Sequence, residues 1–340
     1  MAANPKGELR KRVADLDVEV IPVSVRGDGD VRAARQIRRN FDRLDIVHAH
    51  TGHAHGICRL AMVAHAAAPP LVVSRRVDFP IKGGPAGYWK YRRGVSRYVA
   101  ISDNVKKVLL NSGIPASQIS RVHSGVDLTR GEGKQDRAGI RTELGLAPET
   151  PMVGFIGALV NHKAPQDFIA AMALLPEPVH GVIAGSGHLE DKLRKQTLDL
   201  GLENRLHFLG YREDPLRWVA SVDIFVLPSR LEGLGTSVLD AMAVGTPVVA
   251  TRSGGLPEMI EDGSSGLLVD SGDIQALGQA LTRVLEDRPL RDQIVAGALD
   301  RVRYFSKDRM VDETIQVYED MLADRAPAGP GRGRGKAGTS

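Results

Sequence analysis

The chain has 340 residues, of which 42% are hydrophobic and 25% are charged. This length predicts about two domains, and the composition argues against a largely disordered chain. The single cysteine, Cys58, excludes an internal disulfide, and the longest apolar stretch, residues 60–73, is too short and too interrupted to cross a bilayer. Residues 1–13 are polar and basic and do not resemble a secretory signal, so we expect a cytoplasmic protein.

Charge is unevenly distributed along the chain. Residues 1–140 carry 24 Lys and Arg against 13 Asp and Glu, whereas the remaining residues carry 21 against 28. The basic first half fits either an ordinary solvated surface or an anionic partner, such as a membrane surface or a phosphorylated acceptor. We expect no nucleic-acid partner, because aromatic residues are only 4% of the chain and no RNA-binding or zinc-finger pattern occurs.

The first half alternates short β-rich runs with helical stretches. Strands are expected at residues 18–25, 46–50, 71–74 and 98–101. Asp30 and Ser102 are typical N-cap residues and predict helices that end near residues 40 and 110, and another helix is expected from Gly52 to residue 67. This alternation predicts a parallel sheet with helical crossovers.

A second series of the same kind follows a polar linker over residues 128–139. Its strands are expected at residues 152–156, 179–184, 205–208, 224–227, 247–250 and 266–269. Its helices are expected at residues 166–174, 189–200, 215–221, 236–244, 256–260 and 274–286. The sequence therefore predicts an α/β protein of two Rossmann-like domains, residues 1–138 and 139–305, then a helix over 306–325 and a disordered basic tail over 326–340.

Two glycine-containing turns of the second series suit a phosphate. The segment VGFIGALVNHKAPQDF predicts a strand ending at Gly157, a loop with Lys163 and a helix that begins near Pro165. Helix N–H groups and an ammonium group beyond the carboxyl end of a strand attract a phosphate. A second turn, with Gly185 and Gly187, brings another glycine-lined backbone to the same edge. Each turn alone is equally consistent with an ordinary tight turn.

The most informative segment is PSRLEGLGTSVLDAM. Glu232 directly follows a strand, and Gly233 and Gly235 allow the backbone to approach a ligand before a helix begins at Thr236. Asp240 falls in the early turns of that helix, so both carboxylates can face one crevice. Carboxylates beside exposed N–H groups suit sugar hydroxyls. The alternative is a capping loop with a solvated glutamate.

In this order, these segments resemble the family 4 glycosyltransferases, which are retaining enzymes of the GT-B fold. The resemblance covers nearly the whole chain and includes DIVHAH, AISDNVKKVL, HSGVD, FLGYREDP, SGGLPEMI and SSGLLV. It implies an N-terminal acceptor-side domain, a C-terminal domain that binds a UDP- or GDP-sugar, and a last helix that crosses back to the N-terminal domain. The implied reaction is front-face transfer of a sugar to a hydroxyl, without a metal or a cofactor.

The resemblance also implies roles for individual residues. Lys163 would contact the donor diphosphate, Glu232 would hold the donor sugar, and Asp240 would take the ribose hydroxyls. His50, at the end of DIVHAH, would face the sugar across the cleft, so His50, Lys163 and Glu232 are the implied catalytic residues. The other implied donor-binding residues are Gly157, Gly185, Gly187, Tyr211, Arg212, Arg230, Gly233, Leu234, Gly235 and Thr236.

The chain departs from the family pattern at three places. In the pattern GRLxxxKG, Ala158 replaces the arginine and Ala164 the last glycine. A diphosphate contact worth about 1.5–3 kcal/mol is therefore absent or comes from Arg230 or Arg252. Asp240 is one methylene shorter than the family's glutamate. The chain also enters near residue 18, at what looks like the family's second strand, so the N-terminal domain is expected to be truncated and to lack a central strand.

Two further patterns imitate metal sites, and each has a simpler interpretation. Asp28 and Asp30 form a DxD sequence, but they precede a helix and fit a turn and a cap. A strand end followed by a helix start explains the histidines better than a zinc site does. These histidines are His48, His50, His53 and His55. We expect no metal site.

Taken together, these features predict a retaining glycosyltransferase that acts on a lipid-linked or glycan acceptor in cell-envelope or lipopolysaccharide-type biosynthesis. Basic residues interleaved with aromatic ones at residues 75–76 and 88–93 and at Arg97 are consistent with peripheral contact with an anionic membrane. The alternative function is a non-catalytic, donor-binding relic. Ala158 and the absent first strand favour the relic, whereas the intact residues of the donor site oppose it, namely Lys163, Glu232 and Asp240.

Overall fold

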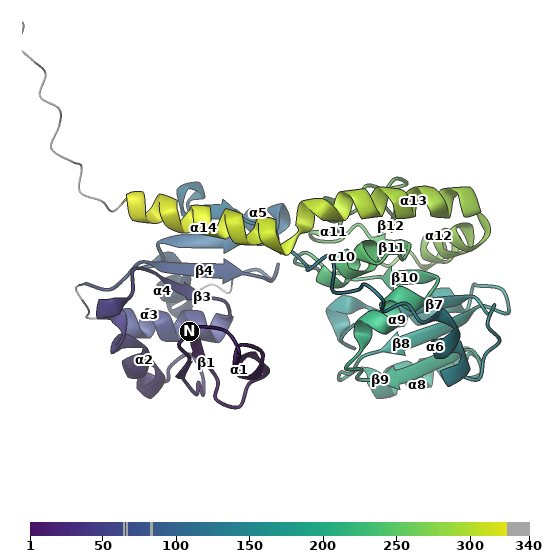
Figure 1. Cartoon of the computed structure of the whole chain (residues 1–340), viewed down its shortest axis with the longest axis horizontal. Coiled ribbons are helices and arrows are strands. Elements are labelled where there is room, and N and C mark those ends of the chain that lie inside the picture. Colours follow the sequence, from purple (N-terminus) through teal and green to yellow (C-terminus); the bar gives the residue numbers. More distant parts are fainter. Residues whose placement is uncertain (64, 66, 82–83, 325–340) are drawn as a thin grey trace, which may run out of the picture.

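The computed structural model describes residues 1–63, 65, 67–81 and 84–324. These residues form two α/β domains, each built on a parallel sheet, which lie side by side in Figure 1. The predicted tail over residues 326–340 lies outside the described residues. Within the described ranges, no helix is both long and apolar enough to cross a membrane.

The C-terminal domain has a six-stranded sheet in the order β12-β11-β10-β7-β8-β9, and all of its strand pairs are parallel. The order reverses between β7 and β10, so the crossovers leave in opposite directions from that point. The strands are β7 Met152–Ile156, β8 His180–Ala184, β9 Leu206–Gly210, β10 Ile224–Leu227, β11 Val248–Thr251 and β12 Leu267–Val269.

Helices cover both faces of this sheet (Figure 1), which explains why its central strands are continuous apolar runs. Every residue of β7 and β10 is buried. The helices of the C-terminal domain are α6 Arg137–Glu143, α7 Pro165–Met172, α8 Glu190–Asp199, α9 Pro215–Ser221, α10 Thr236–Ala243, α11 Leu256–Met259, α12 Ile274–Glu286 and α13 Arg288–Arg301.

The N-terminal domain has a four-stranded parallel sheet in the order β3-β4-β5-β6, and β1 and β2 form a separate two-stranded parallel ladder. The strands are β1 Ala2–Ala3, β2 Ile21–Pro22, β3 Val47–Ala49, β4 Leu71–Arg75, β5 Arg97–Ala100 and β6 Ile119–Arg121. The helices are α1 Glu8–Arg12, α2 Val31–Arg38, α3 Gly52–Met62, α4 Pro85–Arg92 and α5 Asp103–Asn111.

The last helix, α14 (Lys307–Ala323), returns from the C-terminal domain to the N-terminal sheet. Its Val317 and Met321 pack against Val72, Val99 and Val122 of that sheet. A parallel β-bridge between Val126 and Ser306 joins the two crossing segments. The two domains are therefore linked at two places along the chain, once after β6 and once before α14.

Several predicted boundaries differ from the structure. The strand expected at residues 18–25 is reduced to β2, which pairs only with the two residues of β1. β1 and α1 lie ahead of the entry point expected near residue 18. The helix α6 begins at Arg137, inside the predicted linker, because the Asp136 carboxylate accepts the N–H of Gly139. The domain boundary predicted between residues 138 and 139 thus falls within a helix.

Candidate active site

The two glycine turns meet at the carboxyl ends of β7 and β8. The N–H of Gly157 donates to the carbonyl of Ala184 at 2.9 Å, and the N–H of Leu159 donates to the carbonyl of Ser186 at 3.0 Å. A Cβ on Gly185 would lie 1.9 Å from the carbonyl oxygen of Gly157, so a side chain there would force the turns apart. This packing requires the glycine at position 185 and leaves the edge open for a ligand.

Lys163 and Glu232 form an ion pair between the β7 turn and the loop after β10. Both side chains are mostly buried, with 18% and 12% of their surface exposed. The hydroxyl of Ser229 lies 3.3 Å from the Glu232 carboxylate as a second partner. Two residues that lie far apart in the sequence therefore meet beside the switch point of the sheet, where ligands bind in open α/β folds.

Ala164 stands at the junction between the Lys163 turn and α7. Its backbone is left-handed, with φ of 49° and ψ of 47°, and its side chain is fully buried. This conformation favours glycine, which explains why the related pattern ends in glycine here. Alanine retains the turn that aims Lys163 at Glu232, so the departure at position 164 leaves the geometry intact.

The loop from Glu232 to Gly235 is held by close backbone packing. A Cβ on Gly233 would lie 2.6 Å from the carbonyl oxygen of Arg76 in the N-terminal domain, and one on Gly254 would lie 1.9 Å from that of Glu232. Gly235 has a φ of 92° and precedes α10, which begins at Thr236. Leu234 is buried beneath the loop.

The sequence analysis did not identify Asp78 as part of this site. The buried carboxylate of Asp78, in the N-terminal domain, accepts the N–H of Glu232 at 3.0 Å. The sequence signal for it is weak: Asp78 lies four residues after the predicted strand at residues 71–74. Asp78 fixes the Glu232 backbone from across the domain junction.

Asp240 lies on α10 and pairs with Arg130 of the interdomain segment, at 3.0 Å. Its other carboxylate oxygen, Oδ1, is buried and has no hydrogen-bond partner among the described residues. Burial raises the pKa of Asp240, although the nearby Arg130 guanidinium opposes this effect. An unpaired carboxylate oxygen is available for a ligand hydroxyl, and the sequence analysis did not find Arg130.

Tyr211 and Arg212 follow β9 at the same edge of the sheet. The N–H of Gly185 donates to the carbonyl of Gly210 at 2.8 Å, which places these residues next to the second glycine turn. The side chain of Tyr211 is 74% exposed. Arg212 pairs with Asp214 at 3.0 Å, whereas the side chain of Tyr211 is exposed and can contact a ligand.

Of the two arginines considered as substitutes for the position of Ala158, Arg230 lies nearer to Lys163. The N–H of Arg230 donates to the carbonyl of His162 at 2.8 Å, and its guanidinium pairs with Asp167 at 3.1 Å while remaining half exposed. Arg252 pairs instead with Asp262 and Asp270, beside β12. Arg230 is therefore the better-placed cation.

On the N-terminal side, His50 lies at the end of β3 beside a cavity of about 260 Å³. Partial desolvation and then the nearby Arg76 guanidinium lower the pKa of His50. Burial and then His50 lower the pKa of His48 to about 3. Both rings are therefore neutral at pH 7. The cavity also contains the buried hydroxyl of Ser124, which has no hydrogen-bond partner among the described residues.

The DxD sequence and the histidine cluster, which resemble metal sites in the sequence, have other partners among the described residues. His53 pairs with Asp28 at 2.7 Å, and His55 packs on Tyr91. Asp30 accepts the N–H groups of the first turn of α2 and is therefore a cap, as predicted. A different trio, Asp103, His123 and Glu258, is close enough to share an ion, but Arg121 reaches Asp103 and His123 there.

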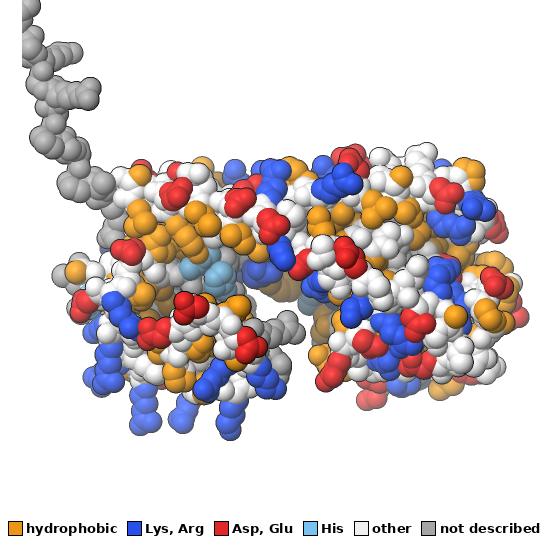
Figure 2. Space-filling view, in the orientation of Figure 1, with side chains coloured by type: hydrophobic (Ala, Val, Ile, Leu, Met, Phe, Trp, Pro, Cys, Tyr) orange, Lys and Arg blue, Asp and Glu red, His pale blue; other side chains and the backbone are white. Residues whose placement is uncertain are grey.

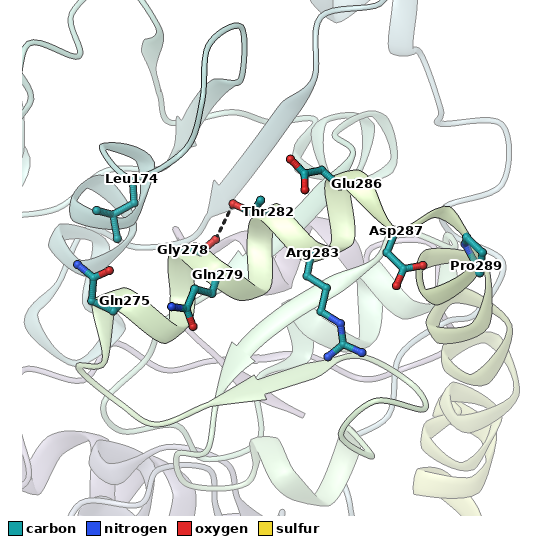
Figure 3. A pocket seen from close by; sticks show the side chains of 9 residues that line it. All are labelled: Leu174, Gln275, Gly278, Gln279, Thr282, Arg283, Glu286, Asp287 and Pro289. Carbon is teal, nitrogen blue, oxygen red and sulfur yellow. Dashed lines mark hydrogen bonds between the residues drawn. The ribbon is translucent and has the colours of Figure 1, made fainter.

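A larger cavity of about 780 Å³ runs along α12, away from the predicted residues. Figure 3 shows its lining, in which most of the side chains come from α12, with Leu174 facing them from another segment and Asp287 and Pro289 just beyond the helix. The lining residues are Leu174, Gln275, Gly278, Gln279, Thr282, Arg283, Glu286, Asp287 and Pro289. None of them belongs to the predicted site.

Comparison with known families assigns both domains. Residues 2–130 match the family described as Glycosyltransferase Family 4, and residues 136–301 match Glycosyl transferases group 1. The chain belongs to the family 4, group 1 glycosyltransferases. This membership agrees with the resemblance drawn from the motifs.

Curated relatives of this chain include two bacterial enzymes. The D-inositol 3-phosphate glycosyltransferase of Nocardioides sp. is 36% identical over 248 residues, which are 66% of this chain and 54% of the relative. The lipopolysaccharide core biosynthesis glycosyltransferase LpsE of Rhizobium meliloti is 35% identical over 178 residues, 52% of each chain. The chain spans about half the length of these relatives.

Solved structures confirm the GT-B fold. The Anabaena protein HepE, in a crystal structure with UDP and glucose, has a TM-score of 0.81 at 22% identity and covers 95% of this chain and 91% of its own. Sucrose-phosphate synthase from Thermosynechococcus elongatus has a TM-score of 0.74 at 18% identity, with coverage of 90% and 84%.

Proposed function

We propose that this glycosyltransferase-family chain moves a sugar, with retention, from a UDP- or GDP-sugar to a hydroxyl acceptor. The observation that carries the proposal is the pair of Lys163 and Glu232 at the switch point of the C-terminal sheet. A cation suited to a diphosphate and a carboxylate suited to sugar hydroxyls lie side by side at the edge where ligands bind. The UDP complex of the structural relative supports the same donor class.

Donor binding would rearrange this pair. The diphosphate would replace Glu232 as the partner of Lys163, and the released carboxylate would accept hydrogen bonds from the donor sugar. The N–H groups around Gly233 and Gly235 would face the phosphates, and Asp240 would take the ribose with its unpaired oxygen. Tyr211 and Arg212 would contact the base.

In the proposed reaction, the bond between the anomeric carbon and the leaving phosphate oxygen breaks. The acceptor oxygen bonds to the same face of that carbon, and its proton passes to the leaving diphosphate. Lys163, with Arg230 and the helix N-termini, would stabilise the negative charge that develops on the diphosphate. With these groups, we propose a reaction that needs neither a metal nor a cofactor.

The acceptor would enter from the N-terminal domain, beside His50. The cavity there offers neutral imidazoles, an unpaired Ser124 hydroxyl and the guanidinium of Arg76, which forms no ion pair among the described residues. We propose a lipid-linked or glycan acceptor in cell-envelope or lipopolysaccharide-type biosynthesis. The activities for which the two curated relatives are named support this context.

We also propose a cytoplasmic location with peripheral contact with an anionic membrane. Figure 2 shows Lys and Arg side chains projecting along the lower edge of the N-terminal domain, where α2 lies. The predicted basic runs are less available, because Arg75 donates to the carbonyl of Phe79, Lys90 pairs with Asp28, and Arg92 donates to the carbonyl of Ser112. Tyr88 and Trp89 of α4 remain exposed.

The competing proposal is a non-catalytic donor-binding protein, and Ala158 is the observation that favours it. A transfer assay separates the two functions. We expect Glu232→Ala to lower turnover at least a hundredfold, measured as release of nucleoside diphosphate at a temperature where the variant is still folded. Its melting temperature should also fall, because Lys163 loses its partner in a largely buried site. Glu203→Ala, at an exposed position, is the matched control and keeps wild-type turnover. Equal turnover in Glu232→Ala would remove Glu232 from the mechanism.

A further inference from the structure

Glu258 of α11 reaches from the C-terminal domain to the N-terminus of α5 in the N-terminal domain. Its two carboxylate oxygens accept the N–H groups of Asp103 at 2.7 Å and Asn104 at 2.8 Å. These are the first two N–H groups of α5, which have no partner inside the helix. A carboxylate at this end of a helix is also favoured by the helix dipole. The cap of α5 is therefore completed from the other domain.

Ser102, the N-cap residue of α5, makes a second connection across the junction. Its buried hydroxyl accepts the N–H of Val105 at 3.1 Å and donates to the carbonyl of Gly233 at 2.6 Å. Gly233 directly follows Glu232 in the donor-side loop. The start of α5 is thus bonded both to α11 and to the loop that carries Glu232.

Glu258 and the Glu232 loop are also joined within the C-terminal domain. The N–H of Gly255, just before α11, donates to the carbonyl of Glu232 at 2.9 Å. Gly254 packs so closely on that carbonyl that no side chain fits. The Glu232 loop, the start of α11 and the start of α5 therefore form one closed, hydrogen-bonded unit across the two domains.

The surroundings of Glu258 favour a charged carboxylate. Only 18% of its side chain is exposed, and the imidazole of His123 lies 3.1 Å away. Burial acts to raise the pKa of Glu258, but hydrogen bonds from His123 and from the two N–H groups outweigh it and lower the pKa. The guanidinium of Arg301 donates to the backbone carbonyl of Glu258 and holds α11 in place.

We propose that Glu258 is a positioning residue of the transfer reaction: by capping α5, it holds the N-terminal domain, with His50, at the distance from the Glu232 loop that transfer requires. The inference rests on the proposed function. Glu258 touches neither the donor nor the acceptor site, so its loss acts through the relative position of the domains. Because misplacing reacting groups by about 1 Å can lower a rate ~100-fold, such a contact affects turnover more than donor affinity.

The test compares Glu258→Gln with Glu261→Gln. The amide retains the shape of Glu258 but removes its charge and one acceptor oxygen. Glu261 lies two residues after α11 with its side chain 59% exposed and pairs with Arg301 at 3.4 Å. Its replacement leaves the hydrogen bond from Arg301 to the Glu258 carbonyl and both N–H groups of α5 untouched, so it is the matched control. For each variant, hydrogen exchange of the Asp103 and Asn104 amides, the Kd of a UDP- or GDP-sugar by calorimetry, and kcat at saturating substrates are measured.

For Glu258→Gln we expect at least tenfold faster exchange of both amides, a donor Kd within about threefold of wild type, and a kcat at least tenfold lower. The aspartate of Glu258→Asp is too short to reach both N–H groups, so its exchange rates and kcat should lie between those of the wild type and Glu258→Gln. It replaces Glu258→Gln in the test if that variant does not fold. If the wild-type chain transfers sugar and Glu258→Gln leaves either its kcat or the hydrogen exchange of the Asp103 and Asn104 amides unchanged, the inference is overturned. A wild-type chain that binds the donor but transfers no sugar contradicts the proposed function instead.

Discussion

Lys163 and Glu232 form an ion pair and so neutralise each other's charge, which lowers the free-energy cost of burying them. Each charge, if left alone in a largely buried site, would be costly to desolvate. The ion pair holds both side chains in the positions from which, in the proposed function, they would bind a diphosphate and a sugar. Both residues could be predicted from the sequence, because each lies in a loop that follows a strand and in a motif that resembles the family.

The partners of these residues could not be predicted in the same way. Arg130 reaches Asp240 and Asp78 reaches Glu232 from more than a hundred residues away in the sequence. Such contacts depend on how the two domains pack, which no local pattern encodes. Arg212, an implied donor-binding residue, also pairs with Asp214 and Glu143 of its own domain, and these partners were not predicted either.

Asp240 yields a prediction about stability and pH. Because burial raises its pKa, the folded state binds the proton more tightly than the unfolded state does. The associated stability is full below the unfolded pKa and is lost as the pH rises through the folded value. We expect Asp240→Asn to raise the free energy of unfolding at pH 7.5 by about 0.5–1 kcal/mol while weakening donor binding. Urea melts with and without a nucleotide sugar measure both effects, and a less stable variant would refute the argument.

At the scale of elements, the buried strands of the C-terminal domain were predicted within one or two residues. β7 and β10 match their predicted bounds because continuous apolar runs in a parallel sheet are a strong local signal. α13 was missed because its buried face is only a narrow stripe of Leu290, Ile294 and Ala298 among polar residues. The bounds of β2 and α6 were predicted wrongly, because β2 pairs only with the two-residue β1 and the Asp136 cap starts α6 inside the expected linker.

The cap of α5 gives the second prediction. Ser102→Ala removes a cap bond, worth about 1–2 kcal/mol, and leaves the buried carbonyl of Gly233 without its partner, which costs about 1–3 kcal/mol more. Thr51→Ala removes only an exposed cap, that of α3, and is expected to cost about 1 kcal/mol. Equal losses of unfolding free energy in denaturant melts would show that the interdomain bond of Ser102 contributes nothing.

At the scale of the whole molecule, acid should weaken the N-terminal domain. Burial lowers the pKa of both His48 and His55 to about 3, whereas each would be near 6.5 when unfolded. The unfolded chain therefore binds more protons, and stability falls as the pH drops from about 6.5 towards 3. At pH 5 each histidine should cost about 2 kcal/mol relative to pH 7.5. His55→Leu should remove about 2 kcal/mol of the stability loss between pH 7.5 and pH 5, and an unchanged pH profile would contradict the assignment.

The proposed sugar transfer requires that a nucleotide sugar binds at the Lys163 turn. The most direct measurement is a thermal-shift screen of the wild-type chain and of Lys163→Met against UDP-, GDP-, ADP- and dTDP-sugars. A ligand at 100 times its Kd adds about 2.7 kcal/mol, which shifts the melting temperature of a chain of this size by about 4 °C. We predict such a shift for one nucleotide with wild type and its loss in Lys163→Met. A cooperative melt that no donor moves, or a shift that survives in the variant, would contradict the account.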